Sequence, residues 1–514
     1  MASASRFLRF RGEFRIFATM KEIIYQVLPR LWGNGKFSAW DDAALSYVKQ
    51  TLRADAIWYT GIIRHATGKT EKVVKGEAGS PYAIVDWYDV NPYLADRAQS
   101  RMKEFEALIE RTHATGLKVI IDFIPNHVAR EYHGAKTPKG SMRLGEGDDR
   151  SQHWSAENDF FYYPGEDLRL PVPAKGYTES PARASGNSFT AAPDVNDWYE
   201  TVKINYCDFH TGTWDKMRDI VRFWAGKGVD GFRCDMVELV PPAFMRWLIA
   251  EIKAEYPAVQ FIAEVYETEK YRLYIDEVGF DLLYDKSGLY DRLRAVMGWE
   301  QGARVLTHNW QMLGGLQPHM LNFLENHDEQ RLASDFFAGS PEAGYAALAV
   351  SLLLNDAPFM LYFGQEIGER GMDNEPFSGV NGRTSIFDWW TVESLQRLFA
   401  WIHDRRKGLQ KEERSVLKHY EELLALSKRP AFAGGKTYDL GYCQGEGFDP
   451  DRDFAFLRSD GKEVWLVAAH FAHEPAELTL RIPDGVAAFL GVPSLPSVTH
   501  LTVSANDAAI LRIQ

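Results

Sequence analysis

The sequence has few cysteines and no excess of positive charge. It contains 3 cysteines among 514 residues. Their odd number and wide spacing predict neither a disulfide framework nor a cysteine metal site. Lysine and arginine number 58 against 71 acidic residues, which gives a formal net charge of −13. Because a phosphate backbone binds to a basic surface, this balance argues against a nucleic-acid partner.

Long apolar runs and phosphate-binding loops are also missing. We find no stretch of about 18 apolar residues, so no transmembrane helix and no membrane partner are expected. The segment 1–19 has several arginines but lacks the apolar core of a secretory signal. We therefore expect a cytoplasmic protein with an N-terminal extension that precedes Met20. No glycine-rich loop follows a strand-like run, which disfavours a nucleotide cofactor.

The chain does contain a regular alternation of strand-like and helix-like segments. Amphipathic stretches occur, for example, at 97–115, 213–227 and 242–256. Eight apolar runs, each followed by helical material, predict an α/β fold in which a parallel sheet closes into a (β/α)8 TIM barrel. An open doubly wound sheet is the alternative. The predicted strands are 22–29, 54–61, 117–124, 228–235, 259–266, 279–286, 319–326 and 358–365.

Two regions interrupt the alternation. Residues 128–205 are rich in proline, glycine, serine and aromatic residues and are too long for a plain loop, which indicates a subdomain inserted after the third strand. From 429 onward, alternating β-type segments with turn signals indicate a separate antiparallel β-domain. We therefore predict a barrel from 20–127 and 206–428, an inserted subdomain from 128–205, and a C-terminal domain from 429–514.

The fourth predicted strand ends on an arginine and an aspartate. Arg233 and Asp235 are two positions apart, so they point to the same side of the strand, while Phe232 and Cys234 point to the other. The neighbouring guanidinium favours the ionised form of the carboxyl group. Taken alone, the pair is also consistent with a purely structural ion pair.

Other strand ends carry polar side chains as well. In a TIM barrel the chemistry lies at the carboxyl ends of the strands. The polar residues there are Asp122, Asn126 and His127 after the third strand, Glu264 after the fifth, and His327 and Asp328 after the seventh. Converging carboxylates suit either a metal site or retaining glycoside hydrolysis. We favour the second, because Arg233 would keep Asp235 ionised while apolar neighbours would raise the pKa of Glu264.

Four ordered segments strengthen this interpretation. "DFIPNH", "GFRCD", "AEVY" and "FLENHD" resemble the sequence regions of the α-amylase family of glycoside hydrolases, and "GSPYAIVDWYDVNP" resembles its segment after the second strand. The similarity covers about residues 22–430. It implies a barrel with a domain inserted after strand three and a C-terminal β-sandwich. It also implies retaining hydrolysis of α-1,4-linked glucose polymers or oligomers, with no cofactor needed for the chemistry.

The resemblance also implies roles for individual residues. Asp235 matches the nucleophile, Glu264 the general acid and base, and Asp328 the third carboxylate of the family. The remaining matches are Arg233, which positions the nucleophile; His127 and His327, which bind sugar hydroxyls; Tyr82, which stacks on a sugar ring; Asp122, which supports the site; and Asn126, which matches a ligand of a structural calcium ion.

The sequence departs from the family pattern after the nucleophile. Endo-acting members often carry a Lys-His pair at the third and fourth positions, where this chain has Glu238 and Leu239. This keeps open an exo-acting α-glucosidase or a transglycosylase that uses the same covalent intermediate. A non-catalytic scaffold is disfavoured, because all three carboxylates are present. The expected partner is an α-glucan or an oligosaccharide.

Overall fold

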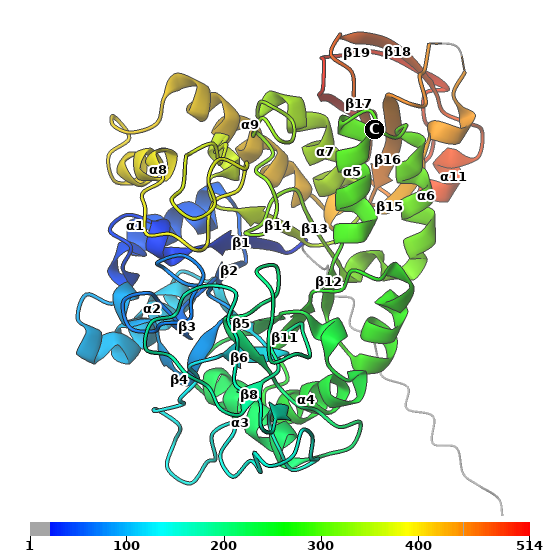
Figure 1. Cartoon of the computed structure of the whole chain (residues 1–514). Helices are drawn as coiled ribbons and strands as arrows, with labels where there is room; N and C mark the ends of the chain where they lie inside the picture. The colour runs from blue at the N-terminus through cyan, green and yellow to red at the C-terminus, as the bar shows by residue number, and fades with distance from the viewer. Residues whose placement is uncertain (1–20, 446) are drawn as a thin grey trace, which may run out of the picture.

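The structure, a computed structural model, describes residues 21–445 and 447–514 (Figure 1). The N-terminal extension predicted for 1–19 lies outside these residues. Eight parallel strands form a closed barrel in the order β1-β14-β13-β12-β11-β10-β5-β2. They are β1 (Ile23–Val27), β2 (Ala56–Tyr59), β5 (Lys118–Phe123), β10 (Gly231–Cys234), β11 (Gln260–Ala263), β12 (Leu282–Tyr284), β13 (Met320–Phe323) and β14 (Phe359–Tyr362).

The barrel prediction is confirmed strand by strand. Each of the eight apolar runs contains one barrel strand, and the closed order rules out the open doubly wound alternative. The three amphipathic stretches form α2 (Arg101–Ala114), α3 (Gly212–Gly226) and α4 (Pro242–Glu255). Further helices are α1 (Asp42–Ser46), α5 (Asp291–Met297), α6 (Arg304–Leu313), α7 (Tyr345–Leu353), α8 (Glu393–His403), α9 (Lys411–Ser427), α10 (Pro430–Ala433) and α11 (Val486–Leu490).

Alternate residues of the barrel strands point into two different cores. Ile24 and Trp58 belong to a cluster inside the barrel, whereas Tyr25 and Ile57 pack in the larger core outside it. The same period of two places Phe232 and Cys234 in the outer core. The guanidinium of Arg233 points inward and lies 5.5 Å from the ring of Trp58. The predicted orientation of this strand is therefore correct.

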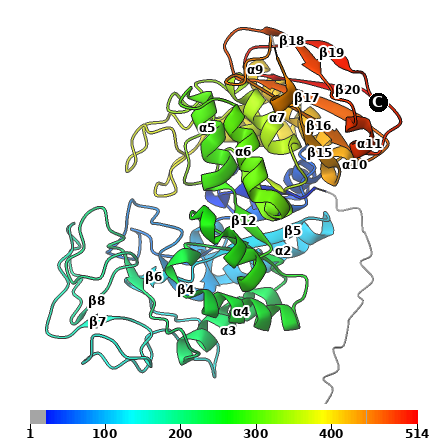
Figure 2. The same ribbon diagram turned by 90° about the vertical axis from the view of Figure 1, so that its right-hand side faces the viewer.

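The connection between β5 and α3 leaves the barrel as a long irregular segment. It contains the short strands β6 (His127–Ala129), β7 (Tyr162–Tyr163), β8 (Ala182–Arg183) and β9 (Thr201–Lys203). Strands β6 and β9 pair in antiparallel fashion, so the segment leaves and re-enters the barrel along one ladder, and its middle extends outward (Figure 2). This ladder supports the division at 128 and 205, which stays a prediction together with the boundary at 429.

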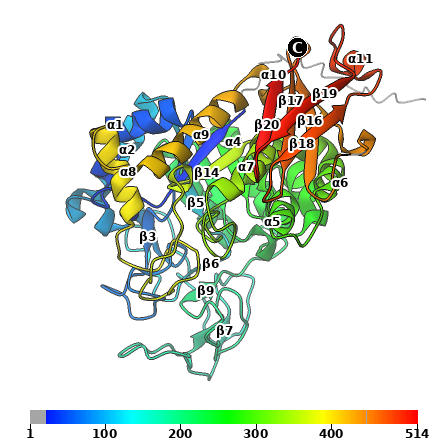
Figure 3. The same ribbon diagram turned by 90° about the horizontal axis from the view of Figure 1, so that it is seen from above.

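The C-terminal region consists of two antiparallel sheets. One contains β15 (Lys436–Asp439), β16 (Asp453–Ser459), β17 (Val464–His470) and β20 (Ala508–Arg512), and the other contains β18 (Ala476–Arg481) and β19 (Val498–Val503). Leu466, Leu480 and Leu501 share one hydrophobic cluster, so the sheets pack face to face. Figure 3 shows them on the side of the barrel away from β7.

Helix α7 lies where the C-terminal sheet meets the barrel. All of its residues after Tyr345 are buried, because the helix contacts both β13 and β17. In the described part of the chain, no helix combines the length and the apolar character that crossing a bilayer requires. A second hairpin, β3 (Ile63–His65) with β4 (Ile84–Val90), extends the connection between β2 and β5.

Candidate active site

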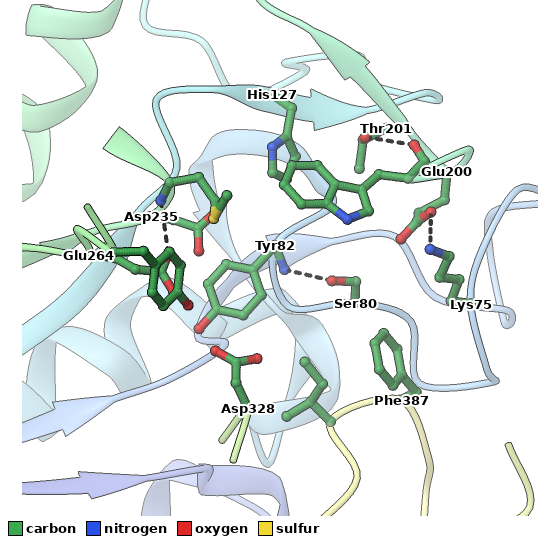
Figure 4. A pocket seen from close by; sticks show the side chains of 14 residues that line it. Lys75, Ser80, Tyr82, His127, Glu200, Thr201, Asp235, Glu264, Asp328 and Phe387 are labelled. Atoms are coloured by element: carbon green, nitrogen blue, oxygen red, sulfur yellow. Dashed lines mark hydrogen bonds and ion pairs between the residues drawn. The ribbon is translucent and has the colours of Figure 1, made fainter. Parts of the chain in front are cut away.

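A cavity of about 230 Å³ lies at the carboxyl ends of the barrel strands (Figure 4). Five of the residues predicted from the sequence line it: Tyr82, His127, Asp235, Glu264 and Asp328. The other predicted residues, Asp122, Asn126, Arg233 and His327, are buried nearby and contact the lining side chains or one another. The lining also includes Lys75, Ser80, Trp198, Glu200, Thr201, Met236, Tyr266, Ile386 and Phe387.

Arg233 is the central cation of the site. Its Nη1 lies 2.5 Å from Oδ1 of Asp235, and its Nη2 lies 3.0 Å from Oε1 of Glu264. A third carboxylate, Asp122, is 3.9 Å from Nη1. The arginine is 0% exposed. A charge removed from water in this way requires opposite charges close by, and these carboxylates provide them.

Asp235 and Glu264 are brought together by strand register. Cys234 pairs with Ala263 across β10 and β11, and the two carboxylates come directly after this pair. Burial raises the pKa of Asp235 well above its ordinary value, and the adjacent guanidinium of Arg233 offsets this only in part, so the pairing is weaker in its effect than the sequence predicts. Both side chains are buried, at 7% exposed for Asp235 and 3% for Glu264.

The surroundings of Glu264 are more polar than the sequence predicts. Besides Arg233, the hydroxyl of Tyr266 donates to its Oε1 at 2.7 Å, and the backbone N–H of Met236 donates to its Oε2 at 2.9 Å. Ala263 and Val265, its neighbours in sequence, pack in the core outside the barrel. The predicted apolar environment therefore describes the burial of this residue but not its contacts.

Asp328 belongs to a chain of hydrogen bonds that crosses the site. Nε2 of His327 lies 3.0 Å from Oδ2 of Asp328 and 2.5 Å from the hydroxyl of Tyr82, while Nδ1 lies 2.7 Å from Nε2 of Gln26. Burial raises the pKa of Asp328, but His327 and Arg233 lower it by more, so the pKa falls to about 2. Asp328 is therefore ionised at neutral pH.

Asp122 contacts this chain through Tyr82, and His127 lines the cavity beside the inserted segment. Asp122 accepts hydrogen bonds from the indole of Trp58 at 3.2 Å and from the hydroxyl of Tyr82 at 3.3 Å, so it holds the Tyr82 ring. The ring of His127 lies 5.2 Å from that of Trp198, which comes from the inserted segment. Burial lowers the pKa of His127 to about 3, so the imidazole is neutral at pH 7.

The residues around Asn126 do not fit a calcium ion. Its amide oxygen accepts a hydrogen bond from the ammonium group of Lys203, which also donates to the backbone oxygen of Leu239 at 2.8 Å. A cation is thus already bonded to the oxygen that would bind calcium. No group of three or more His, Cys, Asp or Glu side chains within 21–445 and 447–514 is placed to hold a metal ion.

Several residues of the site were not predicted from the sequence. Gln26 and Trp58 sit on inward-facing positions of β1 and β2, and a glutamine within a buried apolar strand was a usable signal. Tyr266 lies two residues after Glu264, where its aromatic character alone gave no role. Lys203 and Trp198 come from the irregular segment, where the sequence shows no periodicity.

Comparison with known proteins agrees with this geometry. The family model described as "Alpha amylase, catalytic domain" matches residues 42–278. Alpha-amylase 3 of Dictyoglomus thermophilum is 24% identical over 380 residues, which cover 69% of this chain and 68% of that protein. A 4-alpha-glucanotransferase of Thermotoga neapolitana is 25% identical over 413 residues, covering 73% and 78% of the two chains.

The fold is also shared with solved structures. The cyclic alpha-maltosyl-(1→6)-maltose hydrolase of Arthrobacter globiformis superposes with a TM-score of 0.65 at 17% identity, covering 96% of this chain and 98% of that one. Together, the barrel and the carboxylates at its strand ends define a (β/α)8-barrel enzyme of the glycoside hydrolase class. By these sequence matches the chain is similar to the α-amylase family.

Proposed function

We propose that the chain hydrolyses α-1,4-glucosidic bonds in α-glucans or maltooligosaccharides, with retention of the anomeric configuration. The observation that supports this most is the contact of one guanidinium, Arg233, with both Asp235 and Glu264 at neighbouring strand ends. Neighbouring strands lie about 4.8 Å apart. This spacing is close to the roughly 5 to 5.5 Å between carboxyl groups that a retaining mechanism needs.

In the proposed first displacement, Asp235 attacks the anomeric carbon and Glu264 donates a proton to the departing oxygen. The glycosidic bond breaks as the bond to Asp235 forms. In the second displacement, Glu264 takes a proton from water, whose oxygen attacks the same carbon and releases Asp235. Arg233 stabilises the carboxylate that serves as nucleophile and the one that forms when Glu264 loses its proton.

The other residues would bind the sugar that reacts. Asp328 is ionised, so it can accept hydrogen bonds from sugar hydroxyls and stabilise positive charge that develops on the ring. Tyr82 presents its ring to the cavity, held by Asp122 and His327. The neutral His127 can both donate to and accept from a hydroxyl. In this scheme no step requires a metal ion or cofactor, and the cytoplasmic location remains a prediction.

The stereochemistry of the product tests this proposal. Two displacements at one carbon restore its configuration, so the first-formed sugar should be the α-anomer. Proton NMR at early times, before the anomers equilibrate, distinguishes the two products. If the β-anomer appears first, the double displacement is excluded.

Transglycosylation through the same intermediate is the second candidate. The similarity to a 4-alpha-glucanotransferase over 73% of this chain supports it. A sugar hydroxyl would then replace water in the second displacement. Incubation with maltotriose and separation of the products distinguishes the two activities. Oligosaccharides longer than the substrate indicate transfer, whereas shorter products alone indicate hydrolysis.

A further inference from the structure

Two loops meet at Glu264. One follows β10 and contains Asp235, Met236 and the short 3-10 helix η6 (Val237–Leu239), and the other follows β11 and runs from Glu264 to Glu267. Each loop supplies one donor to the Glu264 carboxylate: the Met236 N–H reaches Oε2, and the Tyr266 hydroxyl reaches Oε1. The proposed acid and base is therefore held from both sides.

Glu238 links the two loops directly. Its Oε2 accepts the backbone N–H of Tyr266 at 2.8 Å, and its Oε1 accepts that of Glu267 at 3.2 Å. The Glu238 side chain is only 12% exposed. Both of its oxygens thus fix the backbone of the residue whose hydroxyl contacts Glu264. Glu238, which departs from the family pattern, therefore makes specific hydrogen bonds within this structure.

The loop that carries Glu238 is itself anchored. Met236 has φ 48° and ψ 43°, a left-handed conformation that costs energy for a residue with a side chain. In this conformation its N–H reaches Glu264. The backbone oxygen of Val237 accepts from Tyr274 at 3.2 Å, and that of Leu239 accepts from Lys203 at 2.8 Å. These contacts therefore fix the backbone on both sides of Glu238.

The donors are distributed unevenly between the two oxygens of Glu264. Oε1 accepts the hydroxyl of Tyr266 and lies 3.0 Å from Nη2 of Arg233 in an ion pair, whereas Oε2 accepts only the N–H of Met236. A carboxylate offers about four lone-pair sites, two on each oxygen. Oε1 thus faces two cationic or hydroxyl groups, whereas Oε2 faces one backbone N–H and keeps a lone-pair site for a proton.

We propose that Glu238 is a positioning residue that acts on Glu264 through Tyr266. By occupying Oε1, Tyr266 leaves Oε2 as the oxygen that carries the transferable proton. This inference rests on the proposed function, because it gives Glu264 the role of acid and base. This role gives Glu238 a use at the position where endo-acting members of the family often carry a lysine.

The first test is Tyr266→Phe, which keeps the ring and removes the donor. On maltoheptaose, whose leaving group needs a proton, kcat/KM should fall about ten-fold, as expected for the loss of one hydrogen bond to a charged group. On α-maltosyl fluoride, whose leaving group needs none, it should stay within about two-fold.

The second test separates Glu238 from Tyr266. Glu238→Ala should show the same contrast between substrates, and Glu238→Gln, which keeps one acceptor, should lie between it and the wild type. If Glu238 acts through Tyr266, the double variant should lose little more than the more affected single variant. Glu269→Ala, which removes an exposed carboxylate from the short 3-10 helix η7 (Thr268–Lys270) after the second loop, is the matched control and should change neither substrate by more than about two-fold.

The outcomes distinguish this inference from the function on which it rests. Equal losses on both substrates for Tyr266→Phe, or additive losses in the double variant, would overturn the positioning role alone. Glu264→Gln, measured alongside, should lose activity on maltoheptaose and keep the first displacement of the fluoride. Equal losses in that variant would overturn the acid role and this inference together. If Glu238→Ala does not fold, Glu238→Gln provides the same comparison.

Discussion

Asp235 and Glu264 directly follow Cys234 and Ala263, a residue pair in the ladder between β10 and β11. Their spacing is therefore set by the register of two barrel strands and not by the loops that follow. A barrel strand is far less variable than a loop. The loops can change length or sequence without moving the two carboxyl groups relative to each other.

Removing the proposed nucleophile, Asp235, gives the first prediction. Asp235→Asn keeps the shape of the side chain but cannot form the covalent intermediate, so kcat should fall by about three orders of magnitude or more. Steady-state kinetics and circular dichroism should show lost turnover in a folded protein. Asp230→Asn, the same change at the other end of the strand, is the control and should stay within about two-fold. Retention of a tenth of the wild-type turnover by Asp235→Asn would refute the assignment.

The second prediction concerns pH and His127. Burial lowers the pKa of its imidazole from an ordinary value of about 6.5 to about 3. Between these values the unfolded chain binds a proton that the folded protein does not, so stability falls as the pH falls through this window. The loss is about 1.4 kcal/mol per pH unit. From pH 7 to pH 5, the wild type should lose roughly 2 kcal/mol more unfolding free energy than His127→Gln. Urea unfolding measures this, and equal losses would contradict it.

The third prediction concerns Lys203. Because its ammonium already bonds the oxygen of Asn126, EDTA should change neither the melting temperature nor the turnover. Lys203→Met should lower the unfolding free energy by about 3 kcal/mol, since two acceptors lose a charged donor. Lys175→Met, at an exposed position of the same segment, should cost less than about 0.5 kcal/mol. A melting temperature that falls with EDTA and recovers with calcium would contradict the prediction.

The fourth prediction concerns substrate length. Glu238 uses both carboxyl oxygens on backbone N–H groups, and no cationic pair takes its place. Neither Glu238 nor Leu239 can therefore offer a sugar on the leaving-group side a charged hydrogen bond, which is worth roughly 1.5 to 3 kcal/mol when formed. We expect a higher kcat/KM on maltotriose to maltoheptaose than on soluble starch counted per chain. Preference for starch, with internal cleavage and early loss of iodine colour, would count against this expectation.

The sequence predicted the barrel and the convergence of its carboxylates, because both follow from local patterns. Each apolar run marks a strand, and parallel strands end at one edge, which brings Asp235 and Glu264 together. The donors to Glu264 were not predicted. They come from Met236, whose backbone conformation has no sequence signal, and from Tyr266, whose direction depends on Glu238.

The contact between Asn126 and Lys203 could not be predicted from the sequence, for another reason. It depends on the pairing of β6 with β9, which are separated by an irregular segment whose composition indicates no register. The resemblance to a family suggested an ion at Asn126. The structure places a lysine side chain there, which a match at one position does not reveal.

A lysine at this junction differs from a metal ion in how the positive charge is supplied. The ammonium of Lys203 is covalently part of the chain, so each molecule carries one. It connects β9, the strand that re-enters the barrel, to Asn126 and to the backbone of Leu239, beside Glu238. It cannot dissociate on dilution or be taken by a competing chelator. The geometry around Glu238 thus depends on the charge of a lysine side chain and not on the concentration of a metal ion in the surroundings.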